Sequence, residues 1–149
     1  MLPYPDIDPV ALALGPIKVH WYGLTYIGGL AFAWWFARLR SAHPHSPLKR
    51  DQVDDLIFYA AIGVVLGGRM GYALFYGFER LASDPLWLFR VWEGGMAFHG
   101  GLLGVLAAMA LFARQRDLQW GRLMDFVAPL TPVGLALGRL GNFIGQELW

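Results

Sequence analysis

Three of the ionisable residues in or next to the apolar segments of this sequence could carry chemistry: His99, Arg69 and Arg139. An ionisable group at membrane depth costs about 3 kcal/mol on insertion scales, so such residues are functional candidates by default. A neutral histidine can accept a proton from a thiol or a hydroxyl near pH 7. An arginine can bind a phosphate through paired donors. The residue types therefore indicate proton transfer and phosphate binding.

His99 lies in the segment Gly94-Gly-Met-Ala-Phe-His-Gly-Gly101, where four glycines remove side-chain bulk around the imidazole. Bare backbone at Gly100 and Gly101 would let a large substrate approach the ring. The alternative is a packed histidine, hydrogen-bonded between helices, with glycine chosen for close helix contact. Spacing alone leaves both interpretations open.

Arg69 lies in Gly67-Gly-Arg-Met-Gly-Tyr72, in the middle of an apolar segment. Its guanidinium could bind a substrate phosphate. It could equally be a structural partner for Asp125 or Glu93, or extend its charged end to the membrane interface.

Arg139 begins the segment Arg-Leu-Gly-Asn142, and Glu147 follows where the expected helix gives way to a loop. Phosphate is a natural ligand for this arginine, with Asn142 as a hydrogen-bonding neighbour and Glu147 orienting the cation. A helix C-terminus with an arginine matched to the helix dipole and a capping glycine explains part of the same pattern.

The elements that must position these residues are membrane helices. Hydrophobic residues make up 56% of the 149 residues and charged residues 15%, whereas soluble domains are about a quarter charged. The apolar block at residues 19–39 is long enough, at about 1.5 Å per residue, to cross about 30 Å of hydrocarbon. Further apolar blocks at residues 56–78 and 96–113 and a shorter one at 123–138 are the other expected spans. The predicted fold is therefore all-α, a polytopic transmembrane helix bundle with about four spans in one membrane-embedded region, residues 1–149.

Segments outside the spans have their own signatures. Residues 1–16 are proline-rich and indicate a surface or interfacial segment. Asp6 and Asp8 precede the first cation, Lys18, which favours an uncleaved first span over a signal peptide. Trp87 and Trp92, in the connection after the second span, are the amphipathic residues expected at headgroup level. Glycines spaced by four residues predict close helix packing at Gly63, Gly67, Gly71, Gly100, Gly104, Gly134 and Gly138.

Cations are unevenly divided between the two sides of the predicted bundle. The loops after the first and third spans hold seven: Arg38, Arg40, Lys49, Arg50, Arg114, Arg116 and Arg122. The opposite side holds Lys18, Arg80, Arg90 and Arg139. The positive-inside rule then puts the N-terminus outside. It also predicts that His99 and Arg139 lie at the same, outer face.

Composition excludes several classes. A net charge of +1 provides no basic field for nucleic acid. The absence of cysteine removes disulfides, thiolate metal sites and a cysteine nucleophile, so a reacting thiol would belong to a substrate. His43 and His45 fit a solvated loop better than a metal site, and no cofactor is implied. Two rivals to an enzyme remain: a channel or transporter component with Arg69 and His99 lining an ion path, and a purely structural membrane subunit.

Four ordered segments carry a family resemblance: His20-Trp-Tyr-Gly23, Leu66-Gly-Gly-Arg-Met-Gly-Tyr72, residues 89–102 and residues 138–149. In order and spacing they resemble the motifs of the prolipoprotein diacylglyceryl transferases, over essentially the whole chain. The resemblance implies an enzyme of the bacterial plasma (inner) membrane, active at the outer face. It would transfer the diacylglyceryl group of the membrane lipid phosphatidylglycerol to the lipobox cysteine of a prolipoprotein, a step of lipoprotein biosynthesis.

The resemblance also implies residue roles. His99 corresponds to the family's essential histidine, a proposed base for the thiol, and Arg139 to the signature arginine that contacts the lipid headgroup. Tyr22, Asn142 and Glu147 occupy further positions on which the family depends.

Two departures from the family pattern matter. The signature usually continues Asn-Phe-x-Asn-Gly-Glu, whereas here Phe143 is followed by Ile-Gly-Gln-Glu147. Family members are also roughly twice as long, with seven spans and another functional arginine in the second half. The chain is therefore expected to be the N-terminal part of a longer domain and to be inactive without the C-terminal half.

Overall fold

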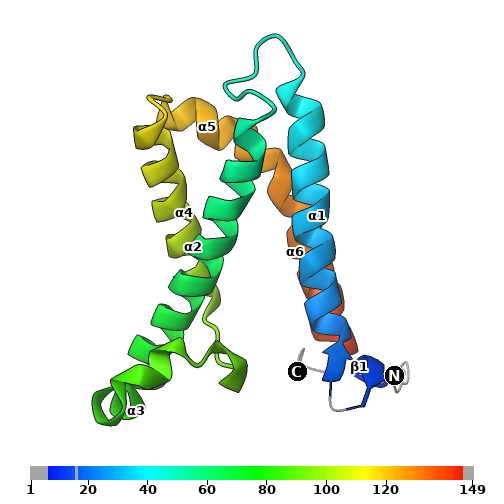
Figure 1. Cartoon of the computed structure of the whole chain (residues 1–149), viewed down its shortest axis with the longest axis vertical. Coiled ribbons are helices and arrows are strands. Elements are labelled where there is room, and N and C mark those ends of the chain that lie inside the picture. The colour runs from blue at the N-terminus through cyan, green and yellow to red at the C-terminus, as the bar shows by residue number, and fades with distance from the viewer. Residues whose placement is uncertain (1–6, 16, 146–149) are drawn as a thin grey trace, which may run out of the picture. The chain divides into compact units, whose positions relative to one another are not determined.

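The computed structural model describes residues 7–15 and 17–145, which are mainly helical (Figure 1). Helices account for about three quarters of the described residues, which confirms the all-α class. The chain forms two compact units. The first comprises Met1–Ser46 with Asp125–Trp149, and the second comprises Pro47–Met124.

The first unit begins with a short hairpin that the sequence did not predict. Strand β1 (Val10–Leu14) pairs antiparallel with β2 (Ile17–His20), and Val10 lies opposite His20. Gly15 takes a φ of 61° in the connection, a left-handed conformation that suits glycine. Helix α1 (Trp21–Ser41) follows at once, so it starts two residues later than the predicted bound of 19.

Two prolines divide the predicted fourth span. Helix α5 (Trp120–Val127) leads into a 3₁₀ turn, η3 (Ala128–Leu130), and then into α6 (Thr131–Ile144). Pro129 and Pro132 each stand in the first turn of their element, where a missing N–H costs nothing. Helix α6 continues six residues beyond the predicted end at 138.

Helices α1 and α6 pack along each other within the first unit (Figure 1). A β-carbon on Gly29 would lie 3.3 Å from the Cα of Gly134, so the two backbones approach closely there. No described atom lies within 4 Å of the position that a β-carbon on Gly138 would take. The position of a β-carbon on Gly134 is equally open, so Gly134 contributes to the close approach only as the backbone that Gly29 meets, and Gly138 makes no such contact.

The second unit is built on α2 (Gln52–Phe75) and α4 (Phe98–Gln115), which run antiparallel side by side (Figure 1). Their glycines face each other. A β-carbon on Gly63 would lie 2.7 Å from the carbonyl oxygen of Gly104, and one on Gly71 would lie 2.7 Å from the Cα of Gly100. This backbone contact confirms the packing role predicted for these glycines.

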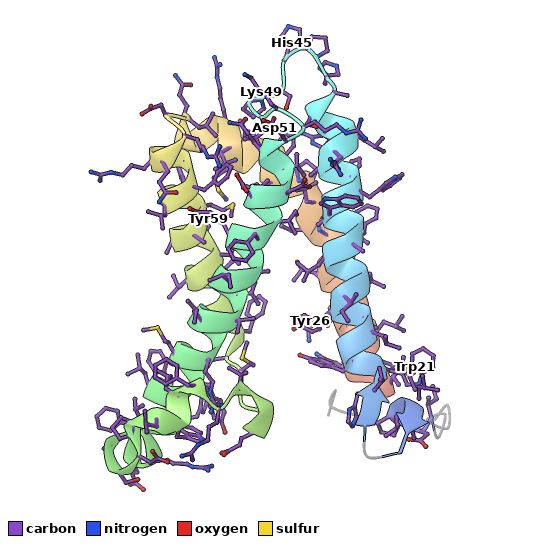
Figure 2. All side chains as sticks on the ribbon, in the orientation of Figure 1. Trp21, Tyr26, His45, Lys49, Asp51 and Tyr59 are labelled. Carbon is purple, nitrogen blue, oxygen red and sulfur yellow. The ribbon has the colours of Figure 1, made fainter. Side chains whose placement is uncertain are left out.

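Side-chain contacts also join the start of α2 to the end of α4. The hydroxyl of Tyr59, which Figure 2 labels on α2, donates a hydrogen bond to Gln115. Nearby, the guanidinium of Arg116 forms an ion pair with Asp55. At the other end the helices are linked through α3 (Phe78–Ser83) and two 3₁₀ turns, η1 (Pro85–Phe89) and η2 (Val91–Glu93).

Three stretches of the described residues are long and apolar enough to cross a membrane: Gln52–Phe75, Phe98–Gln115 and Trp120–Ile144. The chain is thus a multi-pass membrane protein. Helix α1 is not among the three, since its many Trp and Tyr residues are less apolar than aliphatic ones, and its place as the first span stays a prediction. Large apolar side chains such as Ile27, Phe58 and Leu103 are more than 60% exposed, as a lipid-facing surface requires.

Candidate functional site

The predicted site residues fall in both units, and each unit is described by itself. His99, Gly100, Gly101 and Arg69 belong to the second unit. Tyr22, Arg139 and Asn142 belong to the first, while Glu147 lies outside the described residues. The prediction that His99 and Arg139 share one membrane face therefore stays a prediction.

His99 is the second residue of α4 and is exposed. Its ring makes an edge contact with Phe98, at 5.6 Å between centroids, and no hydrogen bond to the imidazole occurs within the described residues. Gly101 is buried, and a β-carbon there would lie 3.6 Å from the carbonyl oxygen of Val64. The glycines thus serve close helix contact, as one interpretation held, but the histidine beside them is not packed between helices.

Arg69 is buried, with 2% of its surface exposed, six residues before the end of α2 at Phe75. Among the described residues of its own unit, its guanidinium donates to backbone carbonyls of the connection to α4 and not to Glu93. Asp125 belongs to the first unit. The acceptors are the carbonyls of Trp87, Leu88, Arg90, Gly94 and Gly95. Of the roles considered for Arg69, the geometry resembles the structural one, with carbonyls in place of carboxylates.

Trp87 lies beneath two arginines of the same unit. The guanidinium of Arg69 stands 4.5 Å from its ring centre and that of Arg80 stands 4.7 Å away. Trp87 is 4% exposed, so its ring is covered by protein rather than by lipid headgroups, and its depth in the membrane stays a prediction. The side chain of Trp92 is outside the described part. Cation–π contact and burial make Trp87 the centre of a small core beneath the connection.

Solvent-exposed ion pairs link residues of the connection between α2 and α4. Arg80 pairs with Glu93 at 2.7 Å, and Arg90 pairs with Asp84 at 2.9 Å. Arg90 also approaches Glu93 at 3.8 Å. The carboxylate of Glu93 is therefore occupied by these two exposed arginines, which explains why it does not serve Arg69.

The last residues before α4 are fixed against α2. Gly94 and Gly95 have φ values of 79° and 84°, which L-residues with side chains rarely adopt. The amide of Ala97 donates to the carbonyl of Gly68 at 2.9 Å. Residues 94–97 thus form a strap across α2, and His99 follows it by two residues.

In the first unit, Arg139 and Asn142 lie three residues apart on α6. That spacing puts them on neighbouring positions of one helix face. Arg139 is exposed and makes no hydrogen bond or ion pair within the described residues, whereas Asn142 is partly buried. Helix α6 ends at Ile144 with Gly145 at its C-cap, so the capping glycine of the alternative interpretation is present. Arg139 lies before the last turn, so it is not the dipole-matched residue of that interpretation.

Tyr22 lies beside α6 and belongs to a group that sequence reasoning only partly found. Its hydroxyl donates to that of Tyr26 at 3.1 Å, and Figure 2 shows Tyr26 at the same end of α1 as Trp21. Thr25 donates to the carbonyl of Tyr22 at 2.8 Å. A β-carbon on Gly141 would lie 2.5 Å from Oγ1 of Thr25 and 3.4 Å from the Cα of Tyr22.

Thr25 and Tyr26 were not singled out from the sequence. Their spacing of three and four residues from Tyr22 would have found them, because such residues neighbour one another on a helix. The first unit thus offers an exposed cation, Arg139, with the amide of Asn142 one turn further along α6, which suits an anionic ligand. The hydroxyls of the Tyr22 group pack against Gly141 of the same helix. The second unit offers an exposed imidazole two residues after a fixed strap, which suits proton transfer.

The fold and these groups define a multi-pass helical membrane protein with a candidate proton acceptor and a candidate anion-binding arginine. Residues 9–149 match the sequence model of the prolipoprotein diacylglyceryl transferase family, and the chain belongs to that family.

Curated relatives agree with this assignment, and each is named phosphatidylglycerol–prolipoprotein diacylglyceryl transferase. The protein from Chromohalobacter salexigens is 64% identical over 148 residues, which cover 99% of this chain and 55% of the relative. The protein from Teredinibacter turnerae is 57% identical over 100% of the chain and 56% of the relative. The protein from Methylococcus capsulatus is 58% identical over 100% of the chain and 57% of the relative. The chain thus spans about half the length of these relatives.

Proposed function

We propose that this chain is the N-terminal part of an enzyme that moves the diacylglyceryl group of phosphatidylglycerol onto the lipobox cysteine of a prolipoprotein. The observation that carries the proposal is the family match over residues 9–149. The relatives named for this activity, at 57–64% identity, support it. A complementary C-terminal half completes the enzyme, and the chain alone is inactive.

The reaction forms one bond and breaks one. The cysteine sulfur attacks the glycerol carbon that carries the phosphate, a thioether forms, and the carbon–oxygen bond to the phosphate breaks. Glycerol 1-phosphate leaves with the bonding electron pair. A site for this chemistry needs a base for the thiol and a cation for the charge that grows on the leaving phosphate.

His99 is the proposed base. Its exposure at the start of α4 supports this role, because a thiol from another protein must reach the imidazole. Gly100 and Gly101 keep the backbone beside the ring free of side chains. They pack against α2 at the same time, so the ring is carried on a rigid helix pair.

Arg139 is the proposed phosphate ligand. Its exposed guanidinium, free of partners among the described residues, supports the binding of an external anion. Asn142 and Tyr22 supply hydrogen-bonding neighbours, and Glu147 is proposed to orient the cation. Arg69 is not proposed as a headgroup ligand, because carbonyls of its own chain already occupy its donors.

The proposed location is the bacterial plasma membrane, with the N-terminus outside and the active site at the outer face. The excess of cations in the two loops after the first and third predicted spans supports this orientation. An outer site also gives access to exported precursors.

The test is a transfer assay on the complete gene product in phosphatidylglycerol-containing vesicles, with a lipobox peptide as acceptor. Mass spectrometry should show thioether-linked diacylglycerol on the peptide, and glycerol 1-phosphate should appear in equal amount. A matched peptide with serine in place of cysteine is the control and should stay unmodified. An unmodified cysteine peptide would refute the proposal, and ion flux through the same vesicles would favour a channel instead.

A further inference from the structure

We propose that Arg69 is a positioning residue for His99: it fixes the strap of residues 94–97 on α2 and thereby sets the place of the first turn of α4. This inference rests on the proposed function, because it assigns a catalytic consequence to the strap. It assigns to Arg69 neither phosphate binding nor an ion path.

The first step is that Arg69 is saturated by one segment. A guanidinium has five N–H groups in a planar fork. In this structure Nε donates to Leu88 at 3.0 Å, one terminal nitrogen donates to Trp87 and Arg90 at 2.7 and 3.0 Å, and the other donates to Gly94 and Gly95. All five N–H groups of Arg69 thus donate to carbonyls of the connection between α2 and α4, and none remains for a ligand.

The second step is that the connection satisfies only part of the acceptor capacity of these carbonyls. The carbonyls of Trp87 and Arg90 each accept one backbone N–H, from Arg90 and Glu93, and each has a second lone pair that faces Arg69. The carbonyls of Leu88, Gly94 and Gly95 lie at the ends of short turns, where backbone acceptors lack helical partners. A buried cation is costly unless it is surrounded by acceptors, and buried carbonyls are costly unless they are bonded. Arg69 and the connection satisfy each other, which explains why the charge is tolerated at 2% exposure.

The third step connects the hydrogen bonds of Arg69 to the position of His99. Gly95, the last carbonyl bound by Arg69, is four residues before His99. Between them Ala97 donates to Gly68, the residue next to Arg69 on α2. Two neighbouring residues of α2 therefore hold both ends of the strap, and α4 starts at Phe98 immediately after it.

The final step is chemical. Proton transfer depends on distance, and a displacement of about 1 Å at a reacting group can lower a rate about 100-fold. Loosening the strap would release the backbone on the N-terminal side of His99, at Ala97 and Phe98, while Gly100 and Gly104 still pack on α2 beyond it. Arg69→Met, which keeps apolar bulk but removes every donor, should therefore lower kcat about 10- to 100-fold. The KM for phosphatidylglycerol should change little, since Arg69 does not bind the lipid.

The first experiment measures kinetics of Arg69→Met, His99→Gln and the double variant in the complete gene product. If Arg69 acts through His99, the double variant should be no slower than His99→Gln alone, because the two changes act on one function. Multiplied losses would overturn the inference. Arg69→Lys, with three donors in place of five, should recover part of the activity and gives a second variant if Arg69→Met fails to accumulate.

The second experiment measures the mobility of the backbone next to the strap and does not depend on enzyme activity. A nitroxide label is attached to a sole cysteine at Phe98→Cys, with Leu111→Cys at the far part of α4 as the matched control; the two positions are 66% and 50% exposed. Arg69→Met should increase label mobility at 98 and leave it unchanged at 111. Unchanged mobility at both positions, or an equal rise at both, would overturn the inference.

Arg116→Gln is the control for a general loss of contact between α2 and α4, because it removes the Asp55 ion pair at the opposite end of the same helices. It should change neither kcat nor label mobility at 98. Full activity of His99→Gln would remove the base assigned under the proposed function, while the nitroxide measurement would still decide whether Arg69 fixes the strap. The two failures are thus distinguishable.

Discussion

Replacing Gly63 by alanine should separate α2 from α4, and the structure gives the size of the effect. The new β-carbon would lie 2.7 Å from the carbonyl oxygen of Gly104 and 2.8 Å from the β-carbon of Ala108. The first of these distances is about 0.7 Å closer than the 3.4 Å at which ordinary contact begins. A backbone oxygen cannot rotate away, so the helices themselves must move.

The cost can be set against the gain from alanine as a helix former. Overpacking of this kind costs up to about 3 kcal/mol. Replacing a helical glycine by alanine returns about 1 kcal/mol. Gly63→Ala should therefore lower the free energy of unfolding by about 2 kcal/mol.

Gly134→Ala is the matched control, because no described atom lies within 4 Å of its β-carbon position and α6 is helical there. It should keep the gain of about 1 kcal/mol. The assay is unfolding of the complete gene product in mixed detergent micelles, followed by circular dichroism. If Gly63→Ala proves as stable as Gly134→Ala, the close contact between α2 and α4 is wrong.

Three further perturbations test other parts of the structure by the same unfolding assay. Gly141→Ala should destabilise by about 1–3 kcal/mol through its contact with Thr25, and adding Thr25→Ala should restore most of the loss; no recovery would contradict that contact. Gly95→Ala should cost about 1–2 kcal/mol because φ is 84° there, and an unchanged stability would mean that the turn has another conformation. Arg116→Gln should cost less than about 1 kcal/mol, since its pair with Asp55 is exposed, and a larger loss would show that the pair is shielded from water.

The helices could be predicted from the apolar blocks, and their ends could not. Helix α2 starts at Gln52 rather than 56, because Asp54 and Asp55 in its first turn favour the helix through the dipole although they are polar. Helix α6 passes Gly138, since glycine inside a helix costs only about 1 kcal/mol and neighbouring contacts outweigh it. The hairpin of residues 10–20 was missed because a proline-rich segment gives a weak strand pattern.

Candidate site residues could be predicted where a particular side chain provides the chemistry. They could not be predicted where backbone carbonyls provide the contacts. The segment around His99 and the face with Arg139 and Asn142 follow from side-chain chemistry and helical spacing. The partners of Arg69 are carbonyls, which every residue has, so no sequence pattern could distinguish them from the carboxylate of Glu93. The burial of Trp87 was not predictable either, because it depends on the two arginines that pack on its ring.

The central claim is that His99 and Arg139 serve one reaction, and steady-state kinetics of the complete gene product test it most directly. His99→Gln and Arg139→Gln are assayed for thioether-linked diacylglycerol on a lipobox peptide, alone and together, beside Arg116→Gln as a control. Each single variant should lose activity by at least about 100-fold, the range of general base and charge-stabilising groups, while the control should stay active. Full activity of both single variants would contradict the assignment of these two residues to the active centre.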